Sequence, residues 1–284
     1  MTTTDPSATG RAPHTAGNAL VDRQWLHTHL NDPLVRVVEV DVSPAAYSEG
    51  HIESATLWNT YADLKDADYR TVDASAFQRL ITRSGIDPDC TVVFYGYAAA
   101  FGFWLTKLYG HRDTRILDCS RETWRAEGRP WTSAVNPLPP GTFRLQGEDA
   151  GIRANEATVR HAVDRPGTTV LDVRSGREYR GECFWPSGGM EPGGRAGHVP
   201  SAVHQPLDDL YNPDGSFRDA AELRGVFSPA VLDGDEELIT YCTIGGRAAT
   251  AWFVLSYLLG RDRVRVYDGS WAEWGRTPGA AAAV

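Results

Sequence analysis

The chain has few cysteines, and none of them is placed as a disulfide framework or a metal site would require. Cys90, Cys119, Cys183 and Cys242 are far apart in the 284 residues and form neither a CxxC pair nor a zinc-type Cys/His pattern. We therefore expect no metal and no disulfides. Reduced thiols of this kind favour a cytoplasmic protein.

Long apolar runs and an excess of positive charge are also missing. No stretch of 18 apolar residues occurs, and the N-terminus has no apolar signal core, so no membrane partner is expected. The formal net charge of −9 argues against nucleic acid or an anionic membrane surface as a partner. An anionic substrate would need a locally positive site, which directs attention to individual arginines.

What the chain does have is an internal repeat. Residues 37–41 (VVEVD) match residues 170–174 (VLDVR), and GHIESA at 50–55 matches GHVPSA at 197–202. LYGHRDTRILD at 108–118 matches LLGRDRVRVYD at 258–268. Strands and helices alternate in both copies, which predicts an α/β fold with two tandem domains, each a parallel β-sheet flanked by helices.

The repeat and the composition predict the domain boundaries. Residues 1–18 are rich in Thr, Ser, Ala, Gly and Pro and are predicted to form a disordered tail. The first domain is predicted at 19–132 and the second at 152–284. Residues 133–151, rich in Pro and Gly, are predicted to be the linker.

The candidate chemistry lies in the second copy. Residues 238–241 predict a buried strand, 242–247 a loop, and 248–259 a helix ended by Gly260. The loop glycines allow several N–H groups to converge near Cys242, and the helix N-terminus favours a thiolate, the nucleophilic form. A passive buried cysteine is the alternative interpretation.

Two stretches resemble a known family. YCTIGGRA at 241–248 and VYDGSWAEW at 266–274 are similar to the active-site half of two-domain rhodaneses, which are thiosulfate or 3-mercaptopyruvate sulfurtransferases. The loop most resembles those of bacterial thiosulfate sulfurtransferases. The resemblance implies that Cys242 takes a sulfane sulfur as a persulfide and that residues Thr243, Ile244, Gly245, Gly246 and Arg247 form the loop around it. No cofactor is implied.

The first copy lacks the cysteine and the arginine of this loop. Gly96 stands where Cys242 stands, and the loop in the first copy has no thiol, no arginine and is about four residues shorter. We expect the first domain to be catalytically empty and, as the resemblance implies, to form one wall of the cleft.

The length of the loop separates sulfur transfer from phosphate chemistry. Four residues lie between Cys242 and Arg247, whereas the rhodanese-like phosphatases and arsenate reductases have five. The smaller loop favours a single sulfur atom over a tetrahedral oxyanion. Arg247 either contacts the anionic donor or braces the loop against Glu178 or Asp172.

The resemblance also implies roles for residues in and just after the strand predicted at 170–174. Asp172 and Arg174 would brace the loop from a neighbouring strand. Glu178 stands where mercaptopyruvate enzymes carry the arginine that grips the substrate carboxylate, so Arg177 and Arg195 are the remaining candidates for that contact. A histidine expected near residues 66–73 for mercaptopyruvate is also missing, which favours thiosulfate.

Two further residues are interpreted as structural. His198 has a counterpart, His51, in the empty copy, so both are expected to support the fold rather than to act as acid or base. Cys183 is expected to be a passive thiol.

The sequence therefore predicts a sulfurtransferase with a small anionic sulfur donor. The acceptor would be cyanide, a thiol or a sulfur-carrier protein. The alternatives are a 3-mercaptopyruvate sulfurtransferase and a persulfide-relay or docking module with little turnover on small molecules.

Overall fold

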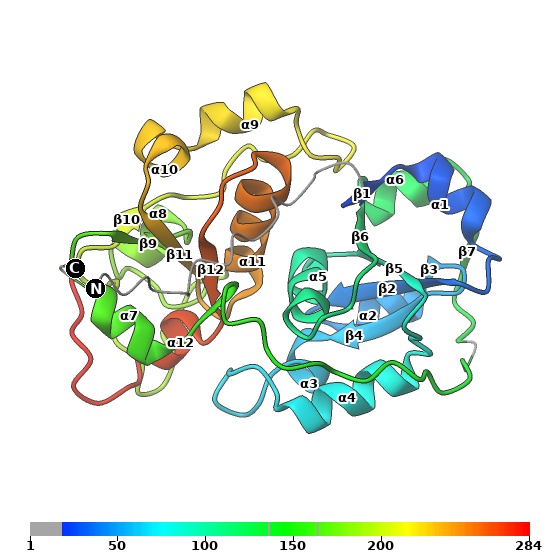
Figure 1. Cartoon of the computed structure of the whole chain (residues 1–284), viewed down its shortest axis with the longest axis horizontal. Helices are drawn as coiled ribbons and strands as arrows, with labels where there is room; N and C mark the ends of the chain where they lie inside the picture. The colour runs from blue at the N-terminus through cyan, green and yellow to red at the C-terminus, as the bar shows by residue number, and fades with distance from the viewer. Residues whose placement is uncertain (1–18, 136, 164) are drawn as a thin grey trace, which may run out of the picture.

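The computed structural model describes residues 19–135, 137–163 and 165–284, so the predicted tail at 1–18 lies outside the described residues. Two α/β halves lie side by side (Figure 1). The first half contains β1 (Leu20–Val21), α1 (Arg23–His29), β2 (Val35–Asp41), α2 (Pro44–Glu49), β3 (His51–Ile52), β4 (Thr56–Asn59), α3 (Thr60–Asp63), α4 (Ala74–Arg83), β5 (Thr91–Tyr95), α5 (Ala99–Leu108), β6 (Thr114–Leu117), α6 (Arg121–Ala126) and β7 (Trp131–Thr132).

The second half repeats this plan. It contains β8 (Arg153–Ala154), α7 (Glu156–Ala162), β9 (Thr168–Asp172), α8 (Gly176–Tyr179), β10 (Val203–His204), α9 (Ala220–Val226), α10 (Pro229–Asp233), β11 (Glu237–Tyr241), α11 (Gly246–Phe253), a π-helical turn (Val254–Leu258), β12 (Val264–Tyr267) and α12 (Ser270–Trp274).

The two main sheets have the same topology. The first has the order β1-β6-β5-β2-β4 and the second β8-β12-β11-β9-β10, with all pairings parallel. Their central strands are apolar runs buried on both faces, as parallel sheets require. Asp and Ser side chains cap α1, α4 and α6 at their N-termini. The predicted α/β fold with two tandem parallel sheets is confirmed.

Strand register identifies equivalent residues in the two halves. Tyr95 on β5 pairs with Glu39 on β2, and Tyr241 on β11 pairs with Asp172 on β9. Gly96 therefore occupies the position of Cys242, as the sequence repeat predicts. Glu39 is the counterpart of Asp172, although the repeat alone does not suggest a role for it.

The four-residue difference between the copies is not all in the loop, which corrects the sequence-based expectation. The first copy connects β5 to α5 with residues 96–98, and the second connects β11 to α11 with residues 242–245. Only one residue is lost from the loop. The rest is lost from the helix, because α11 continues into the π-helical turn and α5 has no such extension.

The halves share a continuous apolar core. Helices α5 and α11 pack together, and Phe103 makes ring contacts with Trp252, Phe253 and Tyr257. The π-helical turn carries Tyr257, which stacks on Phe253 and meets Phe103 edge-on. Burial of these aromatic rings holds the two halves in one orientation.

Two loops add polar contacts between the halves. Asp214 accepts a hydrogen bond from the Ser120 N–H at 2.9 Å, and Asp118 accepts one from the Phe217 N–H at 2.7 Å. The segment after α3, residues 64–73, reaches toward α12 on the other side of the interface (Figure 1). The interface is therefore held above and below the α5–α11 contact.

The described residues of the predicted linker follow the surface of the first half, and none of them belongs to a helix. Gly141 donates to the carbonyl of Thr82 at 2.7 Å, and Phe143 donates to that of Ile86 at 3.1 Å. A side chain at position 141 would come within 2.2 Å of the Ile86 carbonyl, so the chain passes too closely for any residue but glycine. The domain boundaries themselves stay a prediction.

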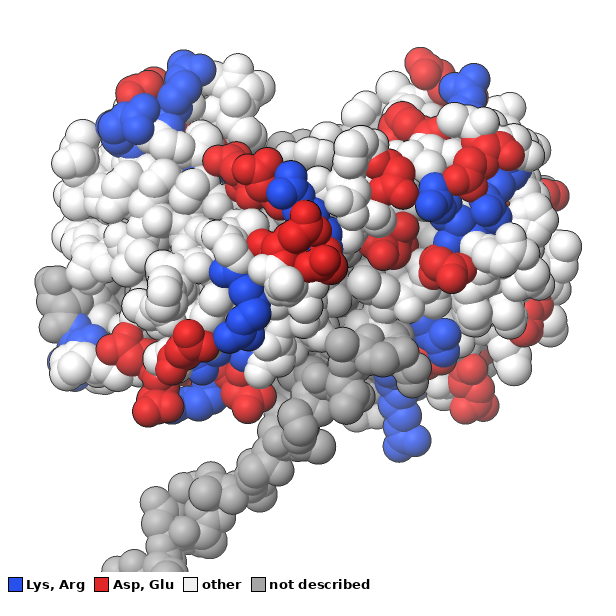
Figure 2. Space-filling view, turned by 90° about the horizontal axis from the view of Figure 1, so that it is seen from above, with Lys and Arg blue, Asp and Glu red and all other residues white. Residues whose placement is uncertain are grey.

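The described surface is mixed in charge. Lys and Arg alternate with Asp and Glu over the face seen from above, where the two halves meet along a furrow (Figure 2). None of the described helices combines the length and hydropathy needed to cross a bilayer.

Candidate active site

The loop after β11 folds back around its own cysteine. Gly245 has a left-handed backbone (φ +96°), and its N–H donates to the Cys242 sulfur at 3.1 Å. A Cβ at this position would lie 2.8 Å from the carbonyl oxygen of Asp268. Glycine is therefore required both by the turn and by the close approach of Asp268. Cys242 is 1% exposed, and its thiol is enclosed by the loop.

The start of α12 holds the loop from below. Trp271 N–H donates to the Cys242 carbonyl and Ala272 N–H to the Thr243 carbonyl, both at 2.9 Å. The hydroxyl of Ser270 accepts the Cys242 N–H at 3.1 Å. Ser270 was not singled out from the sequence by itself, although it lies in the stretch 266–274 that carries the family resemblance.

Glu178 is the centre of a buried polar cluster beside the loop. Its carboxylate is fully buried and accepts hydrogen bonds from Arg247 Nη1 (2.9 Å) and Nη2 (2.7 Å). Further donors are the Thr243 hydroxyl at 2.7 Å, and the Ser175 hydroxyl and N–H at 2.8 and 3.1 Å. Burial acts to raise the pKa of Glu178, but Arg247, Thr243 and Ser175 outweigh it and lower the pKa to about 2.

Arg247 makes a two-pronged contact with Glu178 and also donates to the Thr243 hydroxyl at 2.8 Å. Of the two carboxylates considered from the sequence, Glu178 is the partner and Asp172 is not. The guanidinium side chain remains 26% exposed. This geometry favours the bracing interpretation, because both terminal nitrogens are already engaged.

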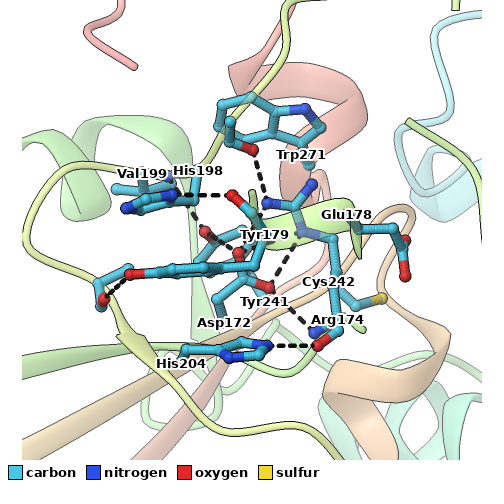
Figure 3. Close-up of polar contacts among 12 residues, drawn as sticks. Asp172, Arg174, Glu178, Tyr179, His198, Val199, His204, Tyr241, Cys242 and Trp271 are labelled. Atoms are coloured by element: carbon cyan, nitrogen blue, oxygen red, sulfur yellow. Dashed lines mark hydrogen bonds and ion pairs between the residues drawn. The ribbon is translucent and has the colours of Figure 1, made fainter. Parts of the chain in front are cut away.

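Asp172 and Arg174 form a second buried pair that supports the loop through its neighbours (Figure 3). Asp172 accepts from Arg174 Nη2 at 2.7 Å and from the Tyr241 hydroxyl at 2.5 Å. The guanidinium of Arg174 lies 4.8 Å over the ring of Trp271, and the backbone N–H of Trp271 donates to the Cys242 carbonyl. The pair thus contacts residues on both sides of the loop, in line with the role that the resemblance implies.

The two histidines occupy equivalent structural positions. His198 stacks on Tyr179 with 3.7 Å between ring centroids, and His51 stacks on Tyr47 at the same distance. Each Nδ1 lies within hydrogen-bond distance of its tyrosine's carbonyl oxygen. Figure 3 shows His198 and His204 on opposite faces of Tyr179. The same arrangement in the first half, where Gly96 replaces Cys242, supports a structural role for both.

Two of the predicted candidates form their polar contacts outside the Cys242 loop. Arg195 uses its guanidinium to hold the backbone carbonyls of residues 274–280, including Gly275 at 3.0 Å and Trp274 at 2.8 Å. Arg177 is 64% exposed on its side chain and pairs with Glu182 at 3.5 Å. Neither braces the loop, because each is engaged elsewhere by nearer partners. Cys183 is buried as a free thiol.

The first half has a counterpart of the Asp172–Arg174 pair, with a longer distance between the acid and the guanidinium. Glu39, the counterpart of Asp172, lies 3.6 Å from Arg121, which comes from α6. Arg121 also donates to the carbonyl of Gly50, just as Arg174 donates to that of Gly197. Burial raises the pKa of Glu39. Among the described residues, neither oxygen of Glu39 accepts a hydrogen bond of ordinary geometry.

A cavity of about 610 Å³ lies between the halves beside the loop. One wall is the loop at residues 96–98 of the first half, which includes Tyr97. The other wall is the start of α11 with Gly246 and Arg247. Leu210 and Phe217 supply apolar surface. Within the described part of the chain, no group of three or more His, Cys, Asp and Glu is arranged to hold a metal ion.

These features define a two-domain α/β protein with one cysteine loop at the N-terminus of a helix. The Rhodanese-like domain family matches residues 22–127 and 156–277. The chain belongs to the rhodanese family, with both halves included.

Similar proteins have the same two-domain length. The sulfur carrier protein TtuD of Thermus thermophilus is 41% identical over 269 residues, which cover 92% of this chain and 94% of that protein. A Haloferax volcanii protein named "Putative thiosulfate sulfurtransferase" is 38% identical over 275 residues, covering 93% and 96%.

Solved structures show the same fold. The structure of YnjE has a TM-score of 0.79 at 23% identity, covering 93% of this chain and 68% of that one. The anaerobic ergothioneine biosynthesis enzyme of Chlorobium limicola, in complex with trimethyl histidine, has a TM-score of 0.80 at 22% identity. That match covers 93% of this chain and 70% of the enzyme.

Proposed function

We propose that the chain is a sulfurtransferase that moves a sulfane sulfur through a persulfide on Cys242. The observation that carries the proposal is the single cysteine loop, in which Gly245 N–H donates to the Cys242 sulfur at the N-terminus of α11. Membership of the rhodanese family and the relatives named above support the same reaction class. The loop and helix N-terminus stabilise negative charge on sulfur before and after loading.

The reaction has two displacement steps. The Cys242 thiolate attacks the outer sulfur of thiosulfate, the S–S bond of thiosulfate breaks, and sulfite leaves with the bonding electrons. The acceptor then attacks the outer sulfur of the persulfide, and the Cys242 thiolate leaves. With cyanide as acceptor the product is thiocyanate. Electrons balance within each step, so no external oxidant or reductant is needed.

The proposed sulfur donor is thiosulfate, and the proposed acceptor is a thiol or a sulfur-carrier protein. Thiosulfate is favoured over mercaptopyruvate because position 178 carries a carboxylate locked onto Arg247, and neither Arg177 nor Arg195 contacts the loop. The cavity between the halves is the proposed approach for both donor and acceptor, since Arg247 lines it. The acceptor is a thiol or a sulfur-carrier protein, and the four unpaired cysteines support a cytoplasmic location.

Intact mass spectrometry tests the nucleophile. After incubation with thiosulfate, we expect the wild-type protein to gain one sulfur and Cys242→Ser to gain none, since serine is not ionised at neutral pH. Cys183→Ala, which removes another buried thiol, is the matched control and should load normally. Sulfur on Cys242→Ser would refute the assignment. Mercaptopyruvate in a parallel arm should load more slowly.

The second candidate, a persulfide-relay module, is favoured by the relative that is named a sulfur carrier protein. Steady-state formation of thiocyanate from thiosulfate and cyanide separates the two. Many turnovers per Cys242 support the enzyme, whereas one sulfur per chain without turnover supports the module.

A further inference from the structure

Lys65 brings a buried positive charge from the first half to the second. It is one of two lysines in the chain and follows α3. The side chain is 4% exposed, and its ammonium donates to the Asp268 carbonyl oxygen at 3.1 Å, across the interface. The Thr71 hydroxyl lies 3.4 Å away, and the ring of Phe101 lies 4.5 Å beneath the charge.

This position is directly behind the cysteine loop. The Asp268 carbonyl oxygen that Lys65 contacts is the same atom that approaches Gly245. Gly245 in turn donates its N–H to the Cys242 sulfur. The ammonium and the sulfur are therefore separated by one carbonyl group and one glycine.

The other charges around Lys65 do not neutralise it by direct contact. The carboxylate of Asp268 is engaged by Arg153 at 3.0 and 3.1 Å and by the Thr71 hydroxyl. Asp66 on the same loop attracts the ammonium more weakly than Asp268 and Cys242 do. Within the described residues, no carboxylate lies within ion-pair distance of Lys65.

Burial lowers the pKa of Lys65 to about 8, although Asp268 and Cys242 act to raise it. The side chain is therefore still mostly protonated at neutral pH. If Lys65 only held the two halves together, an uncharged hydrogen-bond donor would be sufficient. A buried ammonium carries a desolvation cost that an uncharged side chain would avoid. A negatively charged sulfur at Cys242 would be stabilised by this ammonium and would offset its desolvation cost.

We propose that Lys65 is a positioning residue through which the first half stabilises the anionic sulfur of Cys242. The first half, which has no counterpart of Cys242, then contributes a positive charge to the site as well as one wall of the cavity. The inference rests on the proposed role of Cys242 as nucleophile. It does not depend on the identity of the donor or acceptor.

The test is the pH profile of alkylation of Cys242 by iodoacetamide, followed on the Cys242 peptide by mass spectrometry. Lys65→Met removes the charge and keeps the stem, and Lys65→Gln also keeps a donor for Asp268. Both should raise the midpoint of the profile by about one pH unit and slow alkylation at neutral pH several-fold, as expected for loss of one nearby buried charge. Lys65→Arg should retain the wild-type midpoint.

Lys107→Met is the matched control, since Lys107 also lies over a phenylalanine ring, 5.6 Å above Phe103. It should leave the profile unchanged. A wild-type midpoint in Lys65→Met or Lys65→Gln would overturn the inference, even if the melting temperature falls. Failure of the wild-type protein to load sulfur would instead refute the proposed function, because alkylation does not require sulfur transfer.

Discussion

Replacing Arg247 with alanine would leave the most connected carboxylate of the site without its counter-charge. Glu178 is fully buried and accepts five hydrogen bonds, two of them from Arg247. Removing one partner of a buried ion pair typically costs roughly 3 kcal/mol or more. The pKa of Glu178, lowered to about 2 by Arg247, Thr243 and Ser175 against the effect of burial, corresponds to about 3 kcal/mol of stabilisation at neutral pH from these partners together.

Arg247→Lys should recover little of this loss, because an ammonium cannot reproduce the planar two-pronged contact with both carboxylate oxygens. Both variants should also lower kcat. Thr243, which contacts both Arg247 and Glu178, follows Cys242 directly, so a displaced Glu178 displaces the loop.

Urea unfolding at several pH values measures the effect. A carboxylate whose folded-state pKa is lowered stabilises the protein above its unfolded pKa of about 4.3 and loses that contribution as pH falls toward about 2. The difference between wild type and Arg247→Ala should therefore be largest near neutral pH and shrink over this acidic range. Arg177→Ala, which removes an exposed arginine of α8, should unfold like the wild type.

The result that would refute this reasoning is specific. An Arg247→Ala protein with wild-type unfolding at neutral pH and an unchanged kcat, but a raised KM, would show that Arg247 contacts the donor. The two-pronged contact with Glu178 would then have little energetic importance.

Two further comparisons use matched positions. Gly245→Ala should destabilise the protein by about 2 kcal/mol more than Gly188→Ala in urea unfolding, because both have positive φ but only position 245 would press against the Asp268 carbonyl. Asp172→Asn should cost about 3 kcal/mol by the same measurement. Glu39→Gln should gain stability relative to wild type as pH rises, because burial raises the pKa of Glu39 and disfavours its ionised form in the folded state. A larger loss for Glu39→Gln than for Asp172→Asn would contradict this.

The sequence predicts the parts of the fold that depend on local pattern. Repeated strands and turns indicated two parallel sheets, and the run from 237 to 259 indicated a strand, a loop and a helix. It could not indicate the π-helical turn, because that turn accompanies packing of Tyr257 against Phe103 in the other half. Apolar periodicity does not report contacts between domains.

In the candidate site, too, the sequence identified most of the residues but not which of them contact one another. Glu178 and Asp172 both follow β9 closely, so the sequence left either of them as the partner of Arg247. The choice depends on direction: Asp172 ends the strand and faces Tyr241, whereas Glu178 lies in the capping box of α8 and faces the loop. Lys65 and Arg121 were missed because each meets its partner from an element distant in sequence.

The two halves together separate what supports the fold from what supports the chemistry. The buried acid–guanidinium pair occurs in both, although Arg121 in the first half comes from α6 while Arg174 in the second follows β9. Because the first half, which has Gly96 in place of Cys242, also retains an acid beside a guanidinium, this pair is not specific to the cysteine loop.

The contact between Glu178 and Arg247, in contrast, occurs in the second half and has no counterpart among the described residues of the first half. In the first half the position before the stacked Tyr47 is Ala46, where the second half has Glu178 before Tyr179, and the loop at 96–98 contains no arginine. The acid, the arginine and the cysteine are therefore present together or absent together within one chain. A contact needed only to hold strand, turn and helix would be expected in both halves, so the Glu178–Arg247 brace is tied to the use of Cys242.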